Sequence, residues 1–328
     1  MNERIAVVAL NPCVDTALYL STPLTPGGTH RILRTVENPA GKGLNQALMF
    51  QNLGAEVDYF AFGSEDDYDR MNRYVQEQKF RYHRTLCECG IRQNVKIIDK
   101  NHTGTEFNQK GGPISDKELM QLVEELEQYE GDILSLCGSI PQGVDNAVYK
   151  SMLEWGRSRG MITVLDADGE ALRLGLEARP TYIKPNRREF AGLFSMQKSV
   201  FDSDEKIIEA GSVLCRRIGV RILCTLDADG ALYIGPEGVF RVSAIPVKVM
   251  GFAGAGDSFL TAFLWARQIR KSPLPESLNY ATRVAAAKVS LGGSAMPDIE
   301  QIGRMPDAKV RYLGELPTGR SEKPGNDG

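Results

Sequence analysis

The stretch Ala253-Gly254-Ala255-Gly256-Asp257-Ser258 decides the fold and the chemistry expected of this chain. It leads into residues 258–264, an apolar run typical of the first turns of a buried helix. The first N–H groups of a helix have no partner within it, and the positive end of the helix dipole lies behind them. Glycines let that backbone close on a phosphate because no Cβ stands in the way.

An aspartate at such an anion cradle can take a proton from a hydroxyl while the cradle holds a phosphoryl group. Asp257 beside Gly254, Ala255 and Gly256 therefore indicates a small-molecule kinase. An ordinary glycine-rich turn into a helix gives the same pattern, since short glycine motifs recur by chance.

The composition describes an ordinary globular protein of 328 residues, with 42% apolar and 25% charged residues. The net charge of −3 gives no electrostatic reason to expect nucleic acid or an anionic membrane as partner. No apolar run approaches the roughly 18 residues that span a bilayer. The six cysteines form no Cys-x-x-Cys pair and there are three histidines, so no zinc spacing emerges. Reduced, mostly buried thiols fit a cytoplasmic enzyme.

Apolar strand-like runs alternate with helical periodicity, which predicts an α/β fold with a parallel sheet covered by helices on both faces. The predicted strands are residues 5–10, 57–62, 133–137, 162–166, 182–184 and 222–226. The predicted helices are residues 44–53, 116–128, 146–157, 205–217 and 281–291. Ligands of such folds bind at the carboxyl ends of the strands.

Four further strand-like runs break the alternation and predict a small antiparallel lid beside the main sheet. They are residues 15–20, 29–36, 79–87 and 92–98, with Lys79, Arg81, His83 and Arg84 as a solvated face of the lid. We expect a single domain over residues 1–313, with lid strands near 15–36 and 79–98. Residues 314–328 are polar and rich in proline and glycine, which predicts a disordered tail.

Two other segments carry residues suited to ligands. In Ala40-Gly41-Lys42-Gly43-Leu44-Asn45, a second glycine turn opens a helix and suits polyol hydroxyls or a phosphate. In Lys184-Pro185-Asn186-Arg187-Arg188-Glu189, Asn186 and Glu189 fit a helix capping box. The same pair could hold hydrated Mg²⁺ through water, with Lys184 directed at ATP phosphates.

These segments together resemble the PfkB (ribokinase-like) carbohydrate kinases, in particular the phosphosugar branch with the 1-phosphofructokinases and tagatose-6-phosphate kinases. The resemblance runs from about residue 5 to 291 in the family's order. It rests on Gly254-Ala255-Gly256-Asp257, Lys184-Pro185-Asn186 with Glu189, Asn11-Pro12 with Asp15, Thr105-Glu106-Phe107-Asn108, and Gly138-Ser139-Ile140-Pro141 with Gly143.

The resemblance implies a three-layer α/β/α sandwich with a β-sheet lid, a homodimer formed through that lid, and transfer from ATP, with Mg²⁺, to a sugar-phosphate hydroxyl. It implies Asp257 as general base and the Gly254, Ala255 and Gly256 amides as anion hole. The implied sugar-phosphate ligands are Asp15, Arg31, Gly41, Lys42, Asn45, Arg92 and Ser139. The implied nucleotide ligands are Lys184, Asn186, Thr225, Asp227 and Gly230, with Asn186 and Glu189 holding the metal through water.

The chain departs from the family pattern at three positions. Ala40 replaces the first of two glycines, Asp227 replaces a glycine that lets backbone reach the ATP phosphates, and Phe252 replaces a threonine. A carboxylate at 227 repels a triphosphate unless it turns away or faces magnesium.

Fructose 1-phosphate is the expected substrate, with tagatose 6-phosphate and fructose 6-phosphate as alternatives. An unphosphorylated sugar or nucleoside is a second interpretation. A sugar-phosphate-binding protein that has lost its kinase activity is a third.

Overall fold

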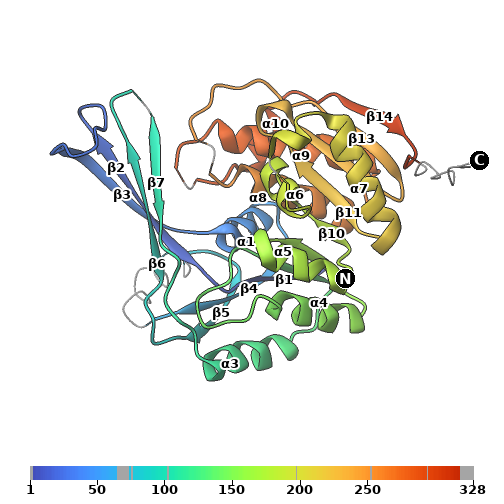
Figure 1. Cartoon of the computed structure of the whole chain (residues 1–328), viewed down its shortest axis with the longest axis horizontal. Helices are drawn as coiled ribbons and strands as arrows, with labels where there is room; N and C mark the ends of the chain where they lie inside the picture. Colours follow the sequence, from blue (N-terminus) through green and yellow to red (C-terminus); the bar gives the residue numbers. More distant parts are fainter. Residues whose placement is uncertain are drawn as a thin grey trace, which may run out of the picture.

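The computed structural model describes residues 3–64, 74, 77–101, 103–196, 198–251, 253–293 and 295–317. Within them the chain forms a sheet of ten strands and a second sheet of four (Figure 1). The strands of the large sheet lie in the order β14 (Val310–Gly314), β13 (Gly238–Val242), β12 (Ala231–Gly235), β11 (Arg221–Thr225), β10 (Tyr182–Ile183), β9 (Ile162–Asp166), β8 (Ile133–Cys137), β1 (Arg4–Ala9), β4 (Glu56–Gly63) and β5 (Arg81–Leu86).

Pairing in this sheet is parallel from β11 through β5 and antiparallel from β11 through β14. The strands in the middle of the sheet are buried on both faces, which is why they read as continuous apolar runs. The prediction of a mostly parallel sheet is confirmed. Its carboxyl-end edge is where a ligand site is expected.

Two apolar cores cover the two faces of the sheet, because successive side chains of a strand point to opposite sides. Ile5 and Val7 of β1 belong to one core, and Ala6 and Val8 to the other. The first core is closed by α1 (Lys42–Asn52), α8 (Ala255–Leu264), α9 (Leu274–Val289) and α10 (Ile299–Gly303). The second is closed by α3 (Asp116–Glu127), α4 (Val148–Ser158), α5 (Gly169–Gly175), α6 (Arg187–Gly192) and α7 (Asp204–Ile218). The predicted three-layer sandwich is confirmed.

The predicted helices are all present, with the largest shift at the last one. Helix α9 begins at Leu274 rather than at residue 281 and carries a proline in its first turn. Proline is tolerated there because the first N–H groups of a helix have no partner within the helix.

The lid is the four-stranded sheet in the order β3 (Ile32–Ala40), β2 (Cys13–Leu20), β6 (Arg92–Ile98) and β7 (Gly104–Asn108). It stands away from the main body at the left of Figure 1. Strands β2 and β6 pair in parallel, whereas both outer pairs are antiparallel. The lid is therefore mixed and not antiparallel as predicted.

The assignment of residues 79–87 to the lid is wrong. Strand β5 pairs in parallel with β4 at the edge of the main sheet, and β7 is the fourth lid strand. Asp58 of β4 explains the pairing, because its buried carboxylate accepts hydrogen bonds from two β5 side chains. Arg81 donates to it from Nε at 2.9 Å and from Nη2 at 2.8 Å, and His83 contacts it through Nε2 at 2.7 Å.

The ion pairs shift the pKa values of both partners. Burial opposes ionisation of Asp58, but the hydrogen bonds from His83 and Arg81 hold its pKa at about 2, below the ordinary 3.8. The hydrogen bond to Asp58, opposed by burial, raises the pKa of His83. Arg81 and His83 thus belong to the main sheet, where their side chains bind Asp58. The prediction that they form a solvated face of the lid is wrong.

The predicted tail begins within an ordered element. Gly314 ends β14, which pairs with β13. Residues 318–328 lie outside the described part of the chain.

The sequence predicts reduced, mostly buried cysteines and no membrane-spanning segment. All six cysteines are free thiols, and five of them are buried, as the sequence predicts. Among the described residues, no helix combines the length and apolarity needed to cross a membrane.

Replacing Asp58 with Asn should lower the free energy of unfolding at pH 7 by about 1–3 kcal/mol, because Arg81 and His83 lose their charged acceptor. Urea denaturation measures it. The folded pKa of Asp58 lies below its ordinary value, so its stabilisation is present above pH 3.8 and is lost as the pH falls through about 2. The difference between wild type and variant should close over the same window.

Glu124→Gln, at an exposed position of α3, is the control and should change stability by less than about 0.5 kcal/mol. A urea midpoint for Asp58→Asn equal to that of the wild type at pH 7 would contradict this account of β5.

Candidate active site

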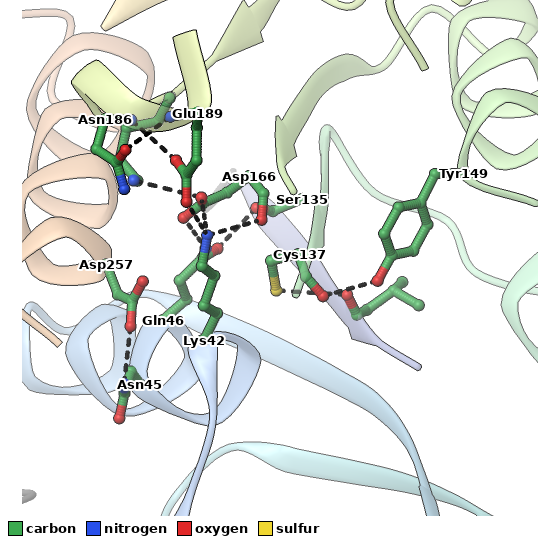
Figure 2. A network of polar contacts seen from close by, with 12 residues as sticks. Lys42, Asn45, Gln46, Ser135, Cys137, Tyr149, Asp166, Asn186, Glu189 and Asp257 are labelled. Atoms are coloured by element: carbon green, nitrogen blue, oxygen red, sulfur yellow. Dashed lines mark hydrogen bonds and ion pairs between the residues drawn. The ribbon is translucent and has the colours of Figure 1, made fainter. Parts of the chain in front are cut away.

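The site lies where the carboxyl ends of β9 and β10 meet the first turns of α1 and α8. Asp166 is the last residue of β9, Lys184 follows β10, Lys42 opens α1, and Asp257 lies in the first turn of α8. Figure 2 shows Lys42, Asp166 and Glu189 directed toward one another, with Asp257 and Asn45 beside them. The topology brings together residues that are far apart in the sequence.

The glycine cradle has the predicted form. Gly254 caps α8 with a left-handed φ of 79°, which favours glycine. The first backbone hydrogen bond of the helix runs from the N–H of Ser258 to the carbonyl of Gly254. The amides of Ala255, Gly256 and Asp257 therefore precede the hydrogen-bonded ladder and are suited to an anion.

Asp257 is buried next to the cradle. Its carboxylate accepts a hydrogen bond of 2.7 Å from Nδ2 of Asn45. Burial and then the negative charge of Asp166 raise its pKa from 3.8 to about 6, against the opposing charges of Lys42 and Lys184. Asp257 is thus a carboxylate that is still ionised at neutral pH but is more basic than an ordinary aspartate.

Asp166 forms the centre of an ion cluster. Its side chain is fully buried, and its Oδ1 lies 2.7 Å from Nζ of Lys42 and 3.3 Å from Nζ of Lys184. Burial opposes ionisation, but the two lysines outweigh it and lower the pKa of Asp166. Gln46 Nε2 reaches the other carboxylate oxygen at 3.5 Å.

Lys42, which the resemblance assigns to the sugar, contacts acidic side chains of the site. Its ammonium group contacts Asp166 and lies 3.5 Å from Oε1 of Glu189, which belongs to the segment assigned to the metal. Burial opposes its charge, but Asp166 and Glu189 raise the pKa of Lys42. The lysine is therefore charged and lies within reach of both Asp166 and Glu189.

Asn186 and Glu189 form the predicted capping box at the start of α6. The Asn186 side chain accepts from the N–H of Glu189 at 2.9 Å, and Glu189 Oε2 accepts from the N–H of Asn186 at 2.8 Å. The cap uses one carboxylate oxygen of Glu189 and leaves Oε1 toward Lys42. The structural and the functional interpretation of this pair are therefore compatible.

A second polar group connects the lid with the loops after β1 and β8. Arg92 donates to the carbonyl of Asn11 at 3.1 Å, and Nδ2 of Asn11 donates to Oγ of Ser139 at 3.0 Å. Arg92 and Asn11 also line a small cavity of about 10 Å³. The structure thus brings the predicted phosphate ligands Arg92 and Ser139 into one group.

Asp15 also faces polar lid residues. It lies 3.2 Å from Nζ of Lys96 and accepts from Nδ2 of Asn94 at 3.0 Å. Gly41, which caps α1 with φ 108°, lies close enough to Cys13 that a Cβ would meet its sulfur at 3.6 Å. The Asp15 end of the lid thus adjoins the start of α1, where Asn45 follows.

Arg31 is not brought to Arg92. In the lid, Cys13 of β2 lies opposite Arg92, whereas Leu20 lies opposite Ile32, which follows Arg31. Cys13 and Leu20 are separated by about 23 Å of extended strand, at roughly 3.3 Å per residue. Arg31 is exposed there and forms no ion pair within the described ranges.

The predicted nucleotide residues lie beyond β11. Thr225 forms an isolated bridge with Asn186, which joins the two segments predicted to bind the nucleotide. Asp227 is exposed and has a left-handed φ of 54°, so the backbone keeps a conformation that favours the glycine expected there. Gly230 has a packing role, because a Cβ would lie 2.1 Å from the carbonyl of Val242. Phe252, the third departure, lies outside the described residues.

The sequence reasoning missed Asp166, Gln46 and Asn94. Asp166 had a usable signal, since it is the last residue of a predicted buried strand and such strand ends converge on a ligand site. Gln46 and Asn94 carried no comparable signal, because a single amide in a helix or strand is most often a surface residue.

The family model of the pfkB family carbohydrate kinases matches residues 8–301. The chain belongs to this family. The matched segment contains the lid, the Asp166 cluster and helix α8. The chain is therefore a carbohydrate kinase, a phosphotransferase that acts on a sugar hydroxyl.

Curated proteins of similar sequence cover nearly the whole chain. The 1-phosphofructokinase of Escherichia coli (strain K12) is 28% identical over 307 residues, which are 93% of this chain and 97% of that protein. A D-tagatose-1-phosphate kinase of Bacillus licheniformis is 28% identical over 302 residues, 91% of this chain and 96% of that protein.

A solved structure supports the fold. Phosphofructokinase-2 from Escherichia coli, in complex with substrates and products, matches with a TM-score of 0.85 at 23% identity, over 92% of this chain and 98% of that one. The predicted ribokinase-like fold with its lid is thereby confirmed.

Proposed function

We propose that this kinase transfers the γ-phosphoryl group of ATP, with Mg²⁺, to a hydroxyl of a ketohexose phosphate, and that fructose 1-phosphate is the substrate. Asp257 carries the proposal: it is buried beside the glycine cradle, hydrogen-bonded by Asn45, and has a pKa of about 6. The two curated relatives are named for kinases of ketohexose 1-phosphates. Tagatose 6-phosphate and fructose 6-phosphate are the alternative substrates.

The sugar phosphate would bind between the lid and α1. Asp15, Gly41 and Asn45 would hold the sugar hydroxyls. Arg92 and Ser139, joined through Asn11, would hold the existing phosphate. A guanidinium group suits this role because its planar fork matches the phosphate oxygens.

The nucleotide would bind along β10 and β11, near Lys184, Asn186, Thr225, Asp227 and Gly230. Lys184 points its ammonium group at the Asp166 cluster, next to the cradle, and a Cβ on Gly256 would lie 3.3 Å from that nitrogen. The exposed side chain of Asp227 can turn to solvent, which removes the repulsion expected for a carboxylate beside a triphosphate.

The donor set fits Mg²⁺. Asn186 and Glu189 offer oxygen atoms at the start of α6, and Oε1 of Glu189 is not used by the capping box. Mg²⁺ keeps most of its water and is held by one or two carboxylates together with substrate phosphates. When bound, it would neutralise charge on the phosphates.

In the proposed reaction Asp257 takes the proton of the attacking hydroxyl as that oxygen bonds to the γ-phosphorus and the bond to ADP breaks. The amides of Gly254, Ala255 and Gly256 hold the phosphoryl oxygens at the positive end of α8. Lys42 balances the negative charges of Asp166 and Glu189. This allows these two carboxylates and that of Asp257 to lie in one site.

We also propose a homodimer formed through the lid and a cytoplasmic location, without a nucleic-acid or membrane partner. Ile32, Leu33 and Phe107 support the dimer, because these lid side chains are 52%, 69% and 56% exposed. Large apolar side chains on an outer sheet often mark an interface. The six free thiols support a reducing compartment.

A coupled assay for ADP over fructose 1-phosphate, fructose 6-phosphate, tagatose 6-phosphate, fructose and ribose tests the function. We expect the highest kcat/KM with fructose 1-phosphate. A preference for fructose or ribose would select the unphosphorylated-sugar interpretation. Calorimetric binding of a phosphosugar without turnover or ATP binding would select the binding protein.

The variant Asp257→Asn should lose about 10²–10⁴-fold in kcat, because it removes a positioned general base. The KM for the sugar phosphate should change little, since Asn retains the size of Asp and can still face Asn45. Steady-state kinetics measures both. A turnover number equal to that of the wild type would remove Asp257 from the mechanism.

The variant Arg92→Ala should raise the KM for fructose 1-phosphate about 10–100-fold, the value of one charge-assisted hydrogen-bonded contact. Arg159→Ala is the control: an exposed arginine after α4, outside the lid and the site, expected to change KM less than about twofold. An equal effect of the two variants would contradict the placement of the sugar's phosphate.

A further inference from the structure

Lys288 is a buried cation that the proposed reaction does not use. It lies in the last turn of α9, and the residue is 1% exposed. Within the described residues its Nζ donates one hydrogen bond, of 2.9 Å, to the carbonyl of Gly293, and it forms no ion pair. Burying an ammonium group that no carboxylate balances is costly.

The side chain of Lys288 reaches Gly254, the first glycine of the anion cradle. A Cβ built on Gly254 would lie 3.2 Å from Cε of Lys288 and 3.2 Å from Nδ2 of Asn45. Lys288 and Asn45 thus line the same glycine, and Asn45 hydrogen-bonds to Asp257. The ammonium group therefore lies near the first turn of α8.

The backbone holds these elements together. The N–H groups of Met250 and Gly251, in the segment before the cradle, both donate to the carbonyl of Val289, the residue after Lys288. A Cβ on Gly251 would lie 3.4 Å from the carbonyl oxygen of Leu291. The end of α9 is thereby fixed against the segment that leads to Gly254.

The charges around Lys288 favour the binding of an anion near its ammonium group. The pKa of Lys288 lies below that of an ordinary lysine, because burial lowers it, and the charge of Lys96 on the lid lowers it further, against the charge of Asp257. Asp257 is itself surrounded by Asp166, Lys42 and Lys184. No carboxylate of the described residues lies within ion-pair distance of Lys288, so a negative group brought to the cradle would add a balancing charge to that of Asp257.

We infer that Lys288 is a positioning residue for phosphoryl transfer: its ammonium group adds fixed positive charge behind Gly254 and stabilises the phosphoryl group held by the cradle. The inference rests on the proposed function. It explains why an otherwise unfavourable buried charge lies beside this glycine. Preorganised charge of this kind acts strongly in a water-excluded site.

A purely structural role would rest on the hydrogen bond to Gly293 and on the favourable position of a cation at the end of α9. The two roles predict different results for Lys288→Met, which keeps the length of the side chain and removes its charge. Loss of a structural contact lowers stability. If Lys288 acts on the phosphoryl group, removing its buried charge should leave the free energy of unfolding unchanged or raise it, while kcat falls.

Kinetics on the full-length wild type and Lys288→Met, with the best sugar of the panel, gives the first test. We expect kcat to fall about 10–100-fold, less than the 10²–10³-fold loss of a donor that touches the charge. We expect KM for the sugar to stay within about twofold and the Tm to equal or exceed that of the wild type.

Arg283→Met is the matched control, since it removes a cation from the same helix. Arg283 donates to the carbonyls of Ile302 and Gly303 and pairs with Asp307. This variant should keep the wild-type kcat and lower the Tm.

Calorimetry with ADP and with the β,γ-imido analogue of ATP gives a readout that does not depend on the sugar. Lys288→Met should lose the additional affinity that the wild type has for the triphosphate and keep its affinity for ADP. An unchanged kcat, or an unchanged preference for the triphosphate together with a lower Tm, would overturn the inference. A wild type that binds neither nucleotide would instead reject the proposed function.

Discussion

The buried ion cluster around Asp166 is the constraint on which the active site depends. One fully buried carboxylate at the end of β9 is balanced by two lysines, from α1 and from the end of β10. Breaking a buried ion pair leaves an uncompensated charge, which is strongly destabilising. The cluster is therefore stable only while all three elements hold their side chains in contact. It therefore ties α1, the end of β9 and the segment after β10 together (Figure 2). It also supplies the negative charge that, after burial, raises the pKa of Asp257.

The rest of the fold places further polar groups near this cluster from two sides. The lid brings Asp15 and Arg92 next to the carboxyl end of β1, and α8 brings its N-terminal amides and Asp257. The capping box of Asn186 and Glu189 serves both the start of α6 and the charge balance of Lys42. Residues that stabilise the fold and residues suited to phosphate chemistry are thus in part the same side chains.

The sequence predicted best what depends on neighbouring residues. The glycine turn before α8 and the Asn186–Glu189 cap are local patterns, and both are present as predicted. Strand 81–86 was assigned to the wrong sheet because its pairing with β4 is stabilised by Asp58, a carboxylate far from it in the sequence. The contacts of Lys42 with Asp166 and Glu189, and the distance of Arg31 from Arg92, could not be read from the sequence for the same reason, since they depend on which elements meet across the fold. Lys288 could not be recognised because a lysine in a helix is ordinarily exposed, and burial is visible only once α8 and α9 are packed.

The most direct measurement is the pKa of Asp257 itself, from ¹³C NMR titration of protein labelled at the aspartate carboxyl carbons, without substrate. Substrate is left out because phosphate groups also ionise near neutral pH. The account predicts one carboxyl resonance that titrates near pH 6 in the wild type and is missing in Asp257→Asn. If the resonance that disappears in the variant titrates at or below the ordinary value of 3.8, the proposed coupling between Asp166 and the general base is wrong.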